Sequence, residues 1–241
     1  MYEREIKIYD DNVGSVAYVQ HMGSDITIVN SARVSFGVEK SSLDERDERL
    51  INYLIKHKHT STMEHNVVTF KFVVPLFVRS QHHRHRTWSY NEISRRYTDK
   101  DLRFYEPSAF RTQHKSNRQA SNPTELKDPN ISGTYRYSLI PPATFYASDA
   151  VRMHHENSLK LFEKLIKAGV CREQARGVLP QNLYTEYYGT VNLNNLLKFI
   201  DLRTHDGAQW EIQQAAKACL EIATDLWPVA VNSYRKIRGG I

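Results

Sequence analysis

The segment from Asn66 to Val74 has the strongest strand character in the chain. Its run V-V-T-F-K-F-V at residues 67–73 consists mainly of β-branched and aromatic residues, and Pro75 follows. Such residues favour a pleated strand and a proline interrupts strand pairing, so we predict a strand here. A helix carrying Phe77, Val78 and Gln81 is expected next. A second β-rich run, from Ile26 to Val29, is predicted as another short strand.

Helical spacing governs most of the remaining sequence. Upstream of the strand, apolar residues at helical intervals (Leu50, Leu54 and Ile55) predict a helix that Ser42 or Asp44 can cap. Downstream, a second helix presents one apolar face (Leu159, Phe162, Leu165 and Ile166), and Gly169 is its expected end.

The clearest helical pattern lies near the C-terminus, from Ala208 to Leu226, with Asp206 as its predicted N-cap and Pro228 just past its end. The segment before it, Leu183 to Leu202, is apolar with Asn and Tyr interruptions. We therefore predict an α+β fold that is richer in helix than in strand. One polar stretch, from Pro107 to Pro142, contains five prolines among Ser, Asn, Gln and Lys. It is predicted to be a mobile surface excursion.

Composition narrows the class of protein. The 241 residues are 40% hydrophobic, enough for a packed core and against disorder. No apolar run approaches the ~20 residues of a membrane span, and the first ten residues do not resemble a signal peptide. The two cysteines, Cys171 and Cys219, are too few for a disulfide framework. We expect a cytoplasmic protein that does not bind a membrane.

The net charge of +6 is concentrated between His82 and Arg96, where arginines and histidines surround Trp88 and Tyr90. Guanidinium groups grip phosphate bidentately and stack on rings, so this segment suits a phosphorylated planar ligand. No glycine-rich Rossmann or P-loop motif and no G-x-S-x-G motif occurs. A small nucleotide is favoured over a polymer because the basic cluster is compact.

Two other interpretations of the basic segment stay open on chemistry alone. One is a solvated basic face without a ligand, and the other is a nucleic-acid-binding module of a different functional class. A metal site is weakly supported. Six histidines lie nearby (His57, His59, His65, His82, His83 and His85), but their spacing matches no zinc pattern and the neighbouring arginines would repel a cation. We predict no metal.

Residues 84–97 read R-H-R-T-W-S-Y-N-E-I-S-R-R-Y, which resembles the R-H-R-x-x-S-x-N-E-x-S-x-R-Y signature of the flavin-dependent thymidylate synthases, the ThyX family. Further blocks in family order resemble it at residues 32–35, 59–65, 172–180, 182–185 and 208–213. The resemblance implies one catalytic domain over residues 1–241, with the polar excursion at 107–142. It also implies a ThyX-like α/β fold with a central antiparallel-rich sheet, flanking long helices and homotetrameric assembly.

The resemblance further implies an enzyme of dTMP biosynthesis, a methyltransferase that converts dUMP to dTMP. It takes the carbon from 5,10-methylenetetrahydrofolate and reducing equivalents from NADPH through FAD, and has no nucleic-acid partner. By motif position, Arg203 is the catalytic residue. The implied dUMP contacts are Gln81, His82, His83, Arg84, Glu92, Ile93, Ser94, Arg95, Arg96, Arg176 and Arg203.

The implied FAD contacts are His59, Ser61, Arg84, His85, Arg86, Glu92, Asn192, Asn194 and Lys198. Some positions depart from the family pattern. The usual N-x-R block reads Asn192-Leu193-Asn194, Lys198 stands where Asn is common, and Gly207 stands where the family has His. We expect Lys198 to meet the flavin pyrophosphate and His205 to substitute for the missing histidine. The implied chemistry requires no cysteine.

Overall fold

A central five-stranded sheet organises the computed structural model, which describes residues 4–133 and 143–238. The strands lie in the order β1 (Glu5–Lys7), β2 (Ser15–Met22), β3 (Val67–Pro75), β9 (Tyr184–Asn192) and β4 (Ser89–Glu92), and every neighbouring pair is antiparallel. The strand predicted at Asn66–Val74 is confirmed as β3, the middle strand. The mixture of helices with an antiparallel sheet confirms the predicted α+β class.

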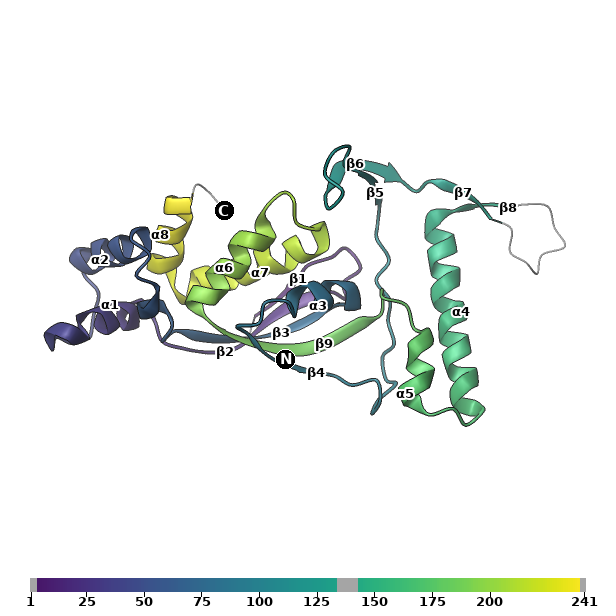
Figure 1. Ribbon diagram of the computed structural model, residues 1–241, viewed down its shortest axis with the longest axis horizontal. Coiled ribbons are helices and arrows are strands. Elements are labelled where there is room, and N and C mark those ends of the chain that lie inside the picture. Colours follow the sequence, from purple (N-terminus) through teal and green to yellow (C-terminus); the bar gives the residue numbers. More distant parts are fainter. Residues whose placement is uncertain (1–3, 134–142, 239–241) are drawn as a thin grey trace.

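Helices cover one face of this sheet. Figure 1 shows α3 (Leu76–His82), α6 (Leu193–Thr204) and α7 (Trp210–Leu226) on the same side of the strands. Residues of β3 alternate accordingly, since Phe70 and Phe72 are fully buried beneath the helices while Lys71 between them is partly exposed. The helix predicted after Pro75 is confirmed as α3. The core thus lies between the sheet and its helical layer.

The predicted strand at Ile26–Val29 is wrong, because these residues lie in α1 (Asp25–Arg33). Ser24 precedes the helix, and its backbone N–H donates to the Thr27 side chain at 3.0 Å. The Asp25 carboxylate accepts from the backbone N–H groups of Val229 and Ala230, at 3.0 and 2.9 Å, in α8 (Pro228–Arg238). This contact with a distant helix outweighs the strand preference of the β-branched residues.

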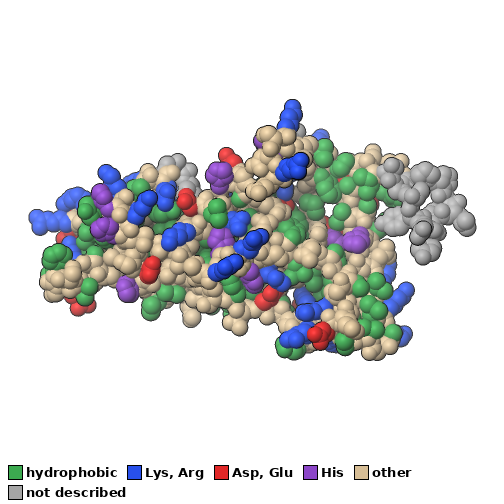
Figure 2. Space-filling model, viewed as in Figure 1, with side chains coloured by type: hydrophobic (Ala, Val, Ile, Leu, Met, Phe, Trp, Pro, Cys, Tyr) green, Lys and Arg blue, Asp and Glu red, His purple; other side chains and the backbone are tan. Residues whose placement is uncertain are grey.

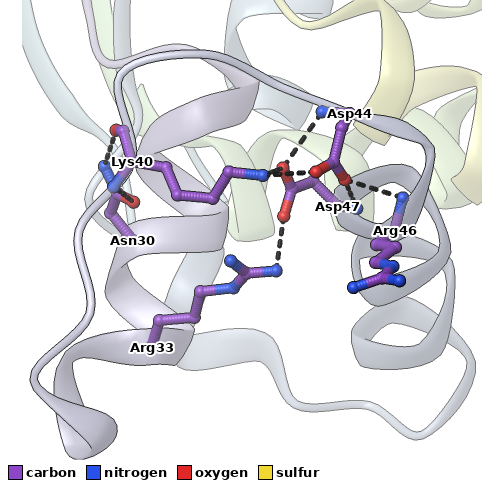
Figure 3. A network of polar contacts seen from close by, with 6 residues as sticks. All are labelled: Asn30, Arg33, Lys40, Asp44, Arg46 and Asp47. Carbon is purple, nitrogen blue, oxygen red and sulfur yellow. Dashed lines mark hydrogen bonds and ion pairs between the residues drawn. The ribbon is translucent and has the colours of Figure 1, made fainter.

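The predicted cap at Asp44 is confirmed at the start of α2 (Glu45–Lys56). Asp44 accepts from the backbone N–H groups of Arg46 and Asp47 at 2.8 and 3.0 Å. Asp47, which is completely buried, binds Arg33 at 2.5 Å and also pairs with Lys40 (Figure 3). We call Asn30, Arg33, Lys40, Asp44 and Asp47 the Asp47 cluster. It fastens the connection between α1 and α2.

The polar stretch at 107–142 forms short strands outside the main sheet. Strands β5 (Phe110–Gln113) and β6 (Ser121–Lys127) pair as one hairpin, and β7 (Asn130–Gly133) pairs with β8 (Ala143–Tyr146). Residues 134–142, and the mobility expected of them, lie outside the described residues. The long α4 (Ala147–Lys167) follows and ends as predicted near Gly169, whose φ of 88° suits glycine. The short α5 (Arg172–Ala175) comes next.

The C-terminal helices begin at different residues from those predicted. Asp206 does not cap α7, because a tight turn in which the Ala208 N–H donates to the His205 carbonyl at 2.8 Å still separates α6 from α7. Gln209 is the N-cap residue instead. Pro228, just past α7 as expected, also starts α8, where a missing N–H costs nothing. No described helix is long and apolar enough to span a membrane.

Candidate active site

A cavity of about 460 Å³ opens where the end of β4 meets the start of β9 and the turn at Arg176–Val178. Five of the predicted nucleotide residues line it: Glu92, Ile93, Ser94, Arg95 and Arg176. The first four are consecutive, whereas Arg176 comes from a helical turn more than eighty residues later in the chain. The fold therefore assembles arginine, serine and backbone groups around one opening, a donor set that suits phosphate.

Glu92 is the most constrained side chain of this cavity. Its carboxylate accepts from the Arg79 Nε at 3.0 Å and from the Thr185 hydroxyl at 2.7 Å. Arg79 belongs to α3 and also lines the cavity, together with Gln181. Neither Arg79 nor Gln181 is among the residues that the motif predicts. Arg79 could have been suspected because it lies on the same predicted helix as Gln81. Its pairing with Glu92, however, arises only from the fold.

Arg95 is held by backbone oxygens. Its Nη1 donates to the Lys100 carbonyl at 2.7 Å and its Nη2 to the Tyr184 carbonyl at 3.3 Å. The Nε has no partner among the described residues. Burial lowers the pKa of this guanidinium from its usual value. Ser94 opens the following turn and accepts the Arg96 N–H at 3.3 Å, while Arg96 itself is exposed.

A second group of predicted residues gathers at the end of α3. Arg203, near the end of α6, donates from Nε to the His85 Nε2 at 3.0 Å and from Nη2 to the Gln81 carbonyl at 3.3 Å. Among the described residues Arg203 forms no ion pair, so neither Asp201 nor Asp206 neutralises it. We call Gln81, His82, His83, Arg84, His85 and Arg203 the Arg203 cluster.

Like charges and burial dominate this cluster. Burial, then the neighbouring Arg84, lowers the pKa of Arg203, and burial with Arg203 lowers the pKa of His85 to about 4. His85 is therefore neutral at pH 7 and accepts the Arg203 hydrogen bond. Figure 2 shows Lys, Arg and His side chains gathered over the part of this face where Figure 1 places α3 and α6. Such a site favours an anionic ligand.

His82 lies beneath this surface, and His83 is partly exposed beside it. His82 is 1% exposed, its Nδ1 bonds the Tyr187 hydroxyl at 2.8 Å, and aromatic rings surround it. His83 stacks on Tyr90 at 4.1 Å between centroids. Burial lowers the pKa of both imidazoles. The Nε2 atoms of both, and Trp88 Nε1, have no partner among the described residues. The His82 side chain is too deep to face a ligand.

The predicted flavin residues occupy two separate places. His59 and Ser61 are exposed beside a cavity of about 470 Å³ near α1, while Arg84 and Arg86 are exposed after α3. Helix α6 separates the two places, and its twelve residues span about 18 Å. Within one chain the structure does not bring the whole predicted flavin set together.

The residues at the start of α6 are largely engaged within the chain. Asn192 caps the helix by accepting the Asn195 N–H at 2.9 Å, and the buried Asn194 donates to Glu64 at 3.0 Å. Lys198, one turn later, is exposed. Exposed Lys198, Arg84 and Arg86 fit a cofactor that carries a pyrophosphate, and the hydroxyl and imidazole of Ser61 and His59 fit its polar groups.

The presence of Gly207 where the family has His has a local explanation. The His205 Nδ1 accepts the Gly207 N–H at 3.0 Å, and a Cβ on Gly207 would lie 3.3 Å from the same nitrogen. The His205 ring thus takes up space that a side chain at 207 would need. In the described part of the chain no three His, Cys, Asp or Glu side chains form a possible metal site.

Comparisons with known proteins show the family of this chain. The family model of the thymidylate synthase complementing protein matches residues 18–229. The flavin-dependent thymidylate synthase of Thermus thermophilus is 42% identical over 92% of this chain and 76% of its own length. That of Thermosipho melanesiensis is 38% identical over 98% of this chain and 97% of its own.

A solved structure is similar in fold as well as in sequence. The UMP/dUMP methylase PolB from Streptomyces cacaoi, bound with 5-Br dUMP, superposes with a TM-score of 0.76 at 30% identity. The match covers 96% of this chain and 97% of PolB. The family resemblance inferred from the 84–97 signature is confirmed, and the chain belongs to the thymidylate synthase complementing protein family.

Proposed function

We propose that this protein is a flavin-dependent thymidylate synthase, a methyltransferase that converts dUMP to dTMP in the cytoplasm. It uses FAD, with NADPH as reductant and 5,10-methylenetetrahydrofolate as carbon donor, and acts as a homotetramer. The observation that carries the proposal is the cavity in which Ser94, Arg95 and Arg176 converge. Flavin-dependent thymidylate synthases and a UMP/dUMP methylase are similar to this chain over nearly its whole length.

The phosphate of dUMP would bind at the cavity. The Ser94 hydroxyl and backbone amides donate to its oxygens, while Arg96 and Arg176 neutralise its charge. Glu92 is held by Arg79 and Thr185, so its orientation is set before the nucleotide arrives. Gln81, Arg84 and Ile93 would complete the nucleotide site. The His82 side chain lies beneath the surface, so its contact would be made by the backbone at the end of α3, whereas the partly exposed His83 could also contribute its side chain.

Arg203 would act on the uracil ring. Its guanidinium is fixed by His85 and by the Gln81 carbonyl, and it keeps further N–H groups for a ligand. A fixed positive charge stabilises negative charge that develops on the ring and makes C5 nucleophilic. No protein thiol is required. Consistent with this, burial raises the pKa of the Cys219 thiol well above its usual value.

FAD would be held by His59, Ser61, Arg84, His85, Arg86, Glu92, Asn192, Asn194 and Lys198. When bound, the flavin supplies the redox step between NADPH and the folate-derived carbon. The two halves of this set lie at opposite ends of α6, which supports a flavin shared between subunits of a tetramer. Exposed Arg84, Arg86 and Lys198 would neutralise its pyrophosphate.

The decisive experiment is a visible absorbance spectrum of the purified protein, repeated without oxygen after NADPH is added, with and without dUMP. A flavin spectrum that NADPH bleaches, followed by dTMP formation when methylenetetrahydrofolate is added, is the expected result. UMP should be tested beside dUMP, because PolB is a UMP/dUMP methylase. A colourless protein that cannot be reconstituted with FAD, and that binds oligonucleotides with a steep salt dependence, would overturn the proposal.

A further inference from the structure

A cavity of about 600 Å³ lies outside the candidate active site, between the β5–β6 hairpin and the turn that joins α6 to α7. We call it the hairpin pocket. None of the implied dUMP and FAD contact residues lines it, although His205, which is expected to substitute for the family histidine, does. Its walls include Arg111, His114 and Asn117 from the hairpin, His205 and Gly207 from the turn, and Trp210 at the start of α7. The polar excursion thus builds half of a separate pocket.

Arg111 and Trp210 form a cation–π platform in the hairpin pocket. The guanidinium lies over the indole, with its Cζ 5.3 Å from the ring centroid. It is held there by the buried Glu211, which accepts from Nη2 at 2.7 Å, and by Ser121, which accepts from Nε at 3.1 Å. A guanidinium held by two such contacts can stack against a planar heterocycle.

Two histidines add hydrogen-bond donors. The His114 Nδ1 accepts the N–H groups of Ser116 and Asn117 at 3.3 and 3.0 Å, and the His205 Nδ1 accepts the Gly207 N–H at 3.0 Å. With Nδ1 occupied as an acceptor, the proton of each neutral imidazole resides on Nε2. Both rings are therefore fixed as Nε2–H donors. Such donors suit phosphate or heterocycle acceptors.

The hairpin pocket is kept open by a glycine and by a rigid wall. A Cβ on Gly207 would lie 3.7 Å from the Asn117 Nδ2 and would extend into the gap between turn and hairpin. The Gln213 amide donates to the carbonyls of His205 and Ala208, at 3.3 and 2.9 Å, which fixes the turn. The cavity is therefore preformed.

A positive rim borders the same pocket. The loop between β5 and β6 carries Lys115 and Arg118, both exposed, directly beside the wall residues His114 and Asn117. Figure 2 shows Lys or Arg side chains projecting where Figure 1 places this hairpin. Exposed cations next to a planar platform are the arrangement that binds a phosphorylated aromatic heterocycle.

The hairpin pocket also adjoins the proposed active site. Gln209 follows the wall residue Ala208, and its side chain bonds the side chain of Gln81 in the Arg203 cluster. Resting on the proposed function for the identity of the reductant, we propose that this pocket binds the adenosine phosphate end of NADPH. The adenine stacks on the Arg111–Trp210 platform, and the phosphates meet Lys115 and Arg118 on the rim.

The probe is adenosine 2′,5′-bisphosphate, which lacks nicotinamide and cannot be a reductant, titrated calorimetrically into the flavin-loaded protein. The double substitution Lys115→Ala/Arg118→Ala removes two exposed charges and should leave the fold intact. We expect its Kd for the probe to rise about tenfold or more. The control Lys160→Ala changes an exposed lysine on α4 and keeps the wild-type Kd. Ribose 5-phosphate, which has no purine, should bind much more weakly than the probe.

Turnover provides a second, separate readout. The double variant should raise the KM for NADPH by a similar factor, with the KM values for dUMP and methylenetetrahydrofolate unchanged. A probe that does not bind, a Kd unaffected by the double substitution, or a rise in the folate KM instead would each overturn the inference. Failure of the proposed function is recognised independently, because the protein would then bind neither dUMP nor flavin.

Discussion

The Asp47 cluster and the Arg203 cluster are both groups of charged and polar side chains, but they are arranged in opposite ways. In the Asp47 cluster the buried carboxylate meets two cations, and the Asn30 side-chain amide both donates to the Lys40 carbonyl and accepts the Lys40 N–H (Figure 3). In the Arg203 cluster a half-buried arginine faces Arg84 and a neutral histidine. The buried Nε2 atoms of His82 and His83 have no partner among the described residues.

This difference separates residues that hold the fold together from residues that we propose bind a ligand. A satisfied network stabilises the folded chain by its own contacts. Like charges and unpaired donors, by contrast, cost free energy until an anion enters, which is why perturbed groups concentrate at functional sites. Arg33 lies in the 32–35 block, and Arg84 and His85 lie in the 84–97 signature. Each cluster thus has members in the family resemblance, which alone does not distinguish their roles.

The largest expected effect is on stability, from Asp47→Ala. The change leaves Arg33 and Lys40 without their buried partner and removes the contact to the Asp44 N–H. We expect a loss of about 3 kcal/mol in the free energy of unfolding, near the lower end for a broken buried pair because both cations can reach water. Urea denaturation measures it. Glu45→Ala, on the same helix but exposed, is the control and should change stability little.

Arg203→Ala should instead lower turnover while leaving stability unchanged. We expect kcat for dTMP formation to fall about 10²- to 10³-fold, as when one fixed transition-state donor is lost. Bound flavin and the free energy of unfolding should be retained, because Arg203 has no ion pair among the described residues. Arg203→Lys keeps the positive charge but not the planar set of guanidinium donors, so it should recover only part of the rate. Unchanged turnover in Arg203→Ala would remove Arg203 from the catalytic machinery.

Local sequence patterns predicted the secondary structure correctly where residues close in sequence determine it. The strand at Asn66–Val74 and the cap at Asp44 depend on residue type and on contacts within a few positions. The strand prediction at Ile26–Val29 failed because the determining contact, from Asp25 to the start of α8, spans about two hundred residues. The prediction of Asp206 as an N-cap failed because the turn before α7 is held by Gln213, a residue inside the helix. A tertiary contact therefore sets the first segment, whereas the second is set by a side chain that reaches back from inside α7.

The same distinction applies to the candidate site. The family resemblance of residues 84–97 implied Glu92 to Arg95 as nucleotide contacts, and the structure places these consecutive residues at one cavity. Arg79 and Thr185 reach Glu92 only through the packing of α3 and the pairing of β4 with β9. The hairpin pocket could not be predicted either, since it exists only where the hairpin meets the turn after α6.

A smaller effect on stability should follow from Asn30→Ala. Asn30 donates to the Lys40 carbonyl at 2.9 Å and accepts the Lys40 N–H at 3.0 Å, so it anchors the connection that carries Lys40 toward Asp47. Two neutral hydrogen bonds predict a loss of about 1–2 kcal/mol. Amide hydrogen exchange should show increased opening at residues 34–43. Asn52→Ala on α2, whose amide bonds only the Glu48 carbonyl, is the matched control with a smaller effect.

The smallest expected effect is a change in the pH dependence of stability. Burial and Arg203 lower the pKa of His85 to about 4, whereas an unfolded histidine titrates near its ordinary value of 6.5. Between these values the unfolded chain binds more protons than the folded one, so the free energy of unfolding falls as the pH is lowered from 6.5 toward 4. His85→Gln keeps an acceptor for Arg203. It removes the proton, about one per chain, that the unfolded His85 would bind in this pH range.

The free energy of unfolding should therefore decrease less between pH 7 and pH 5 in His85→Gln than in the wild type, by urea denaturation at both values. His82, His83 and His155 also have lowered pKa values, so part of the acid sensitivity should remain. His65→Gln, an exposed position, should behave as the wild type. An equal decrease in His85→Gln would mean that Arg203 does not restrain His85. The Arg203 cluster would then be less strained than the contrast with the Asp47 cluster requires.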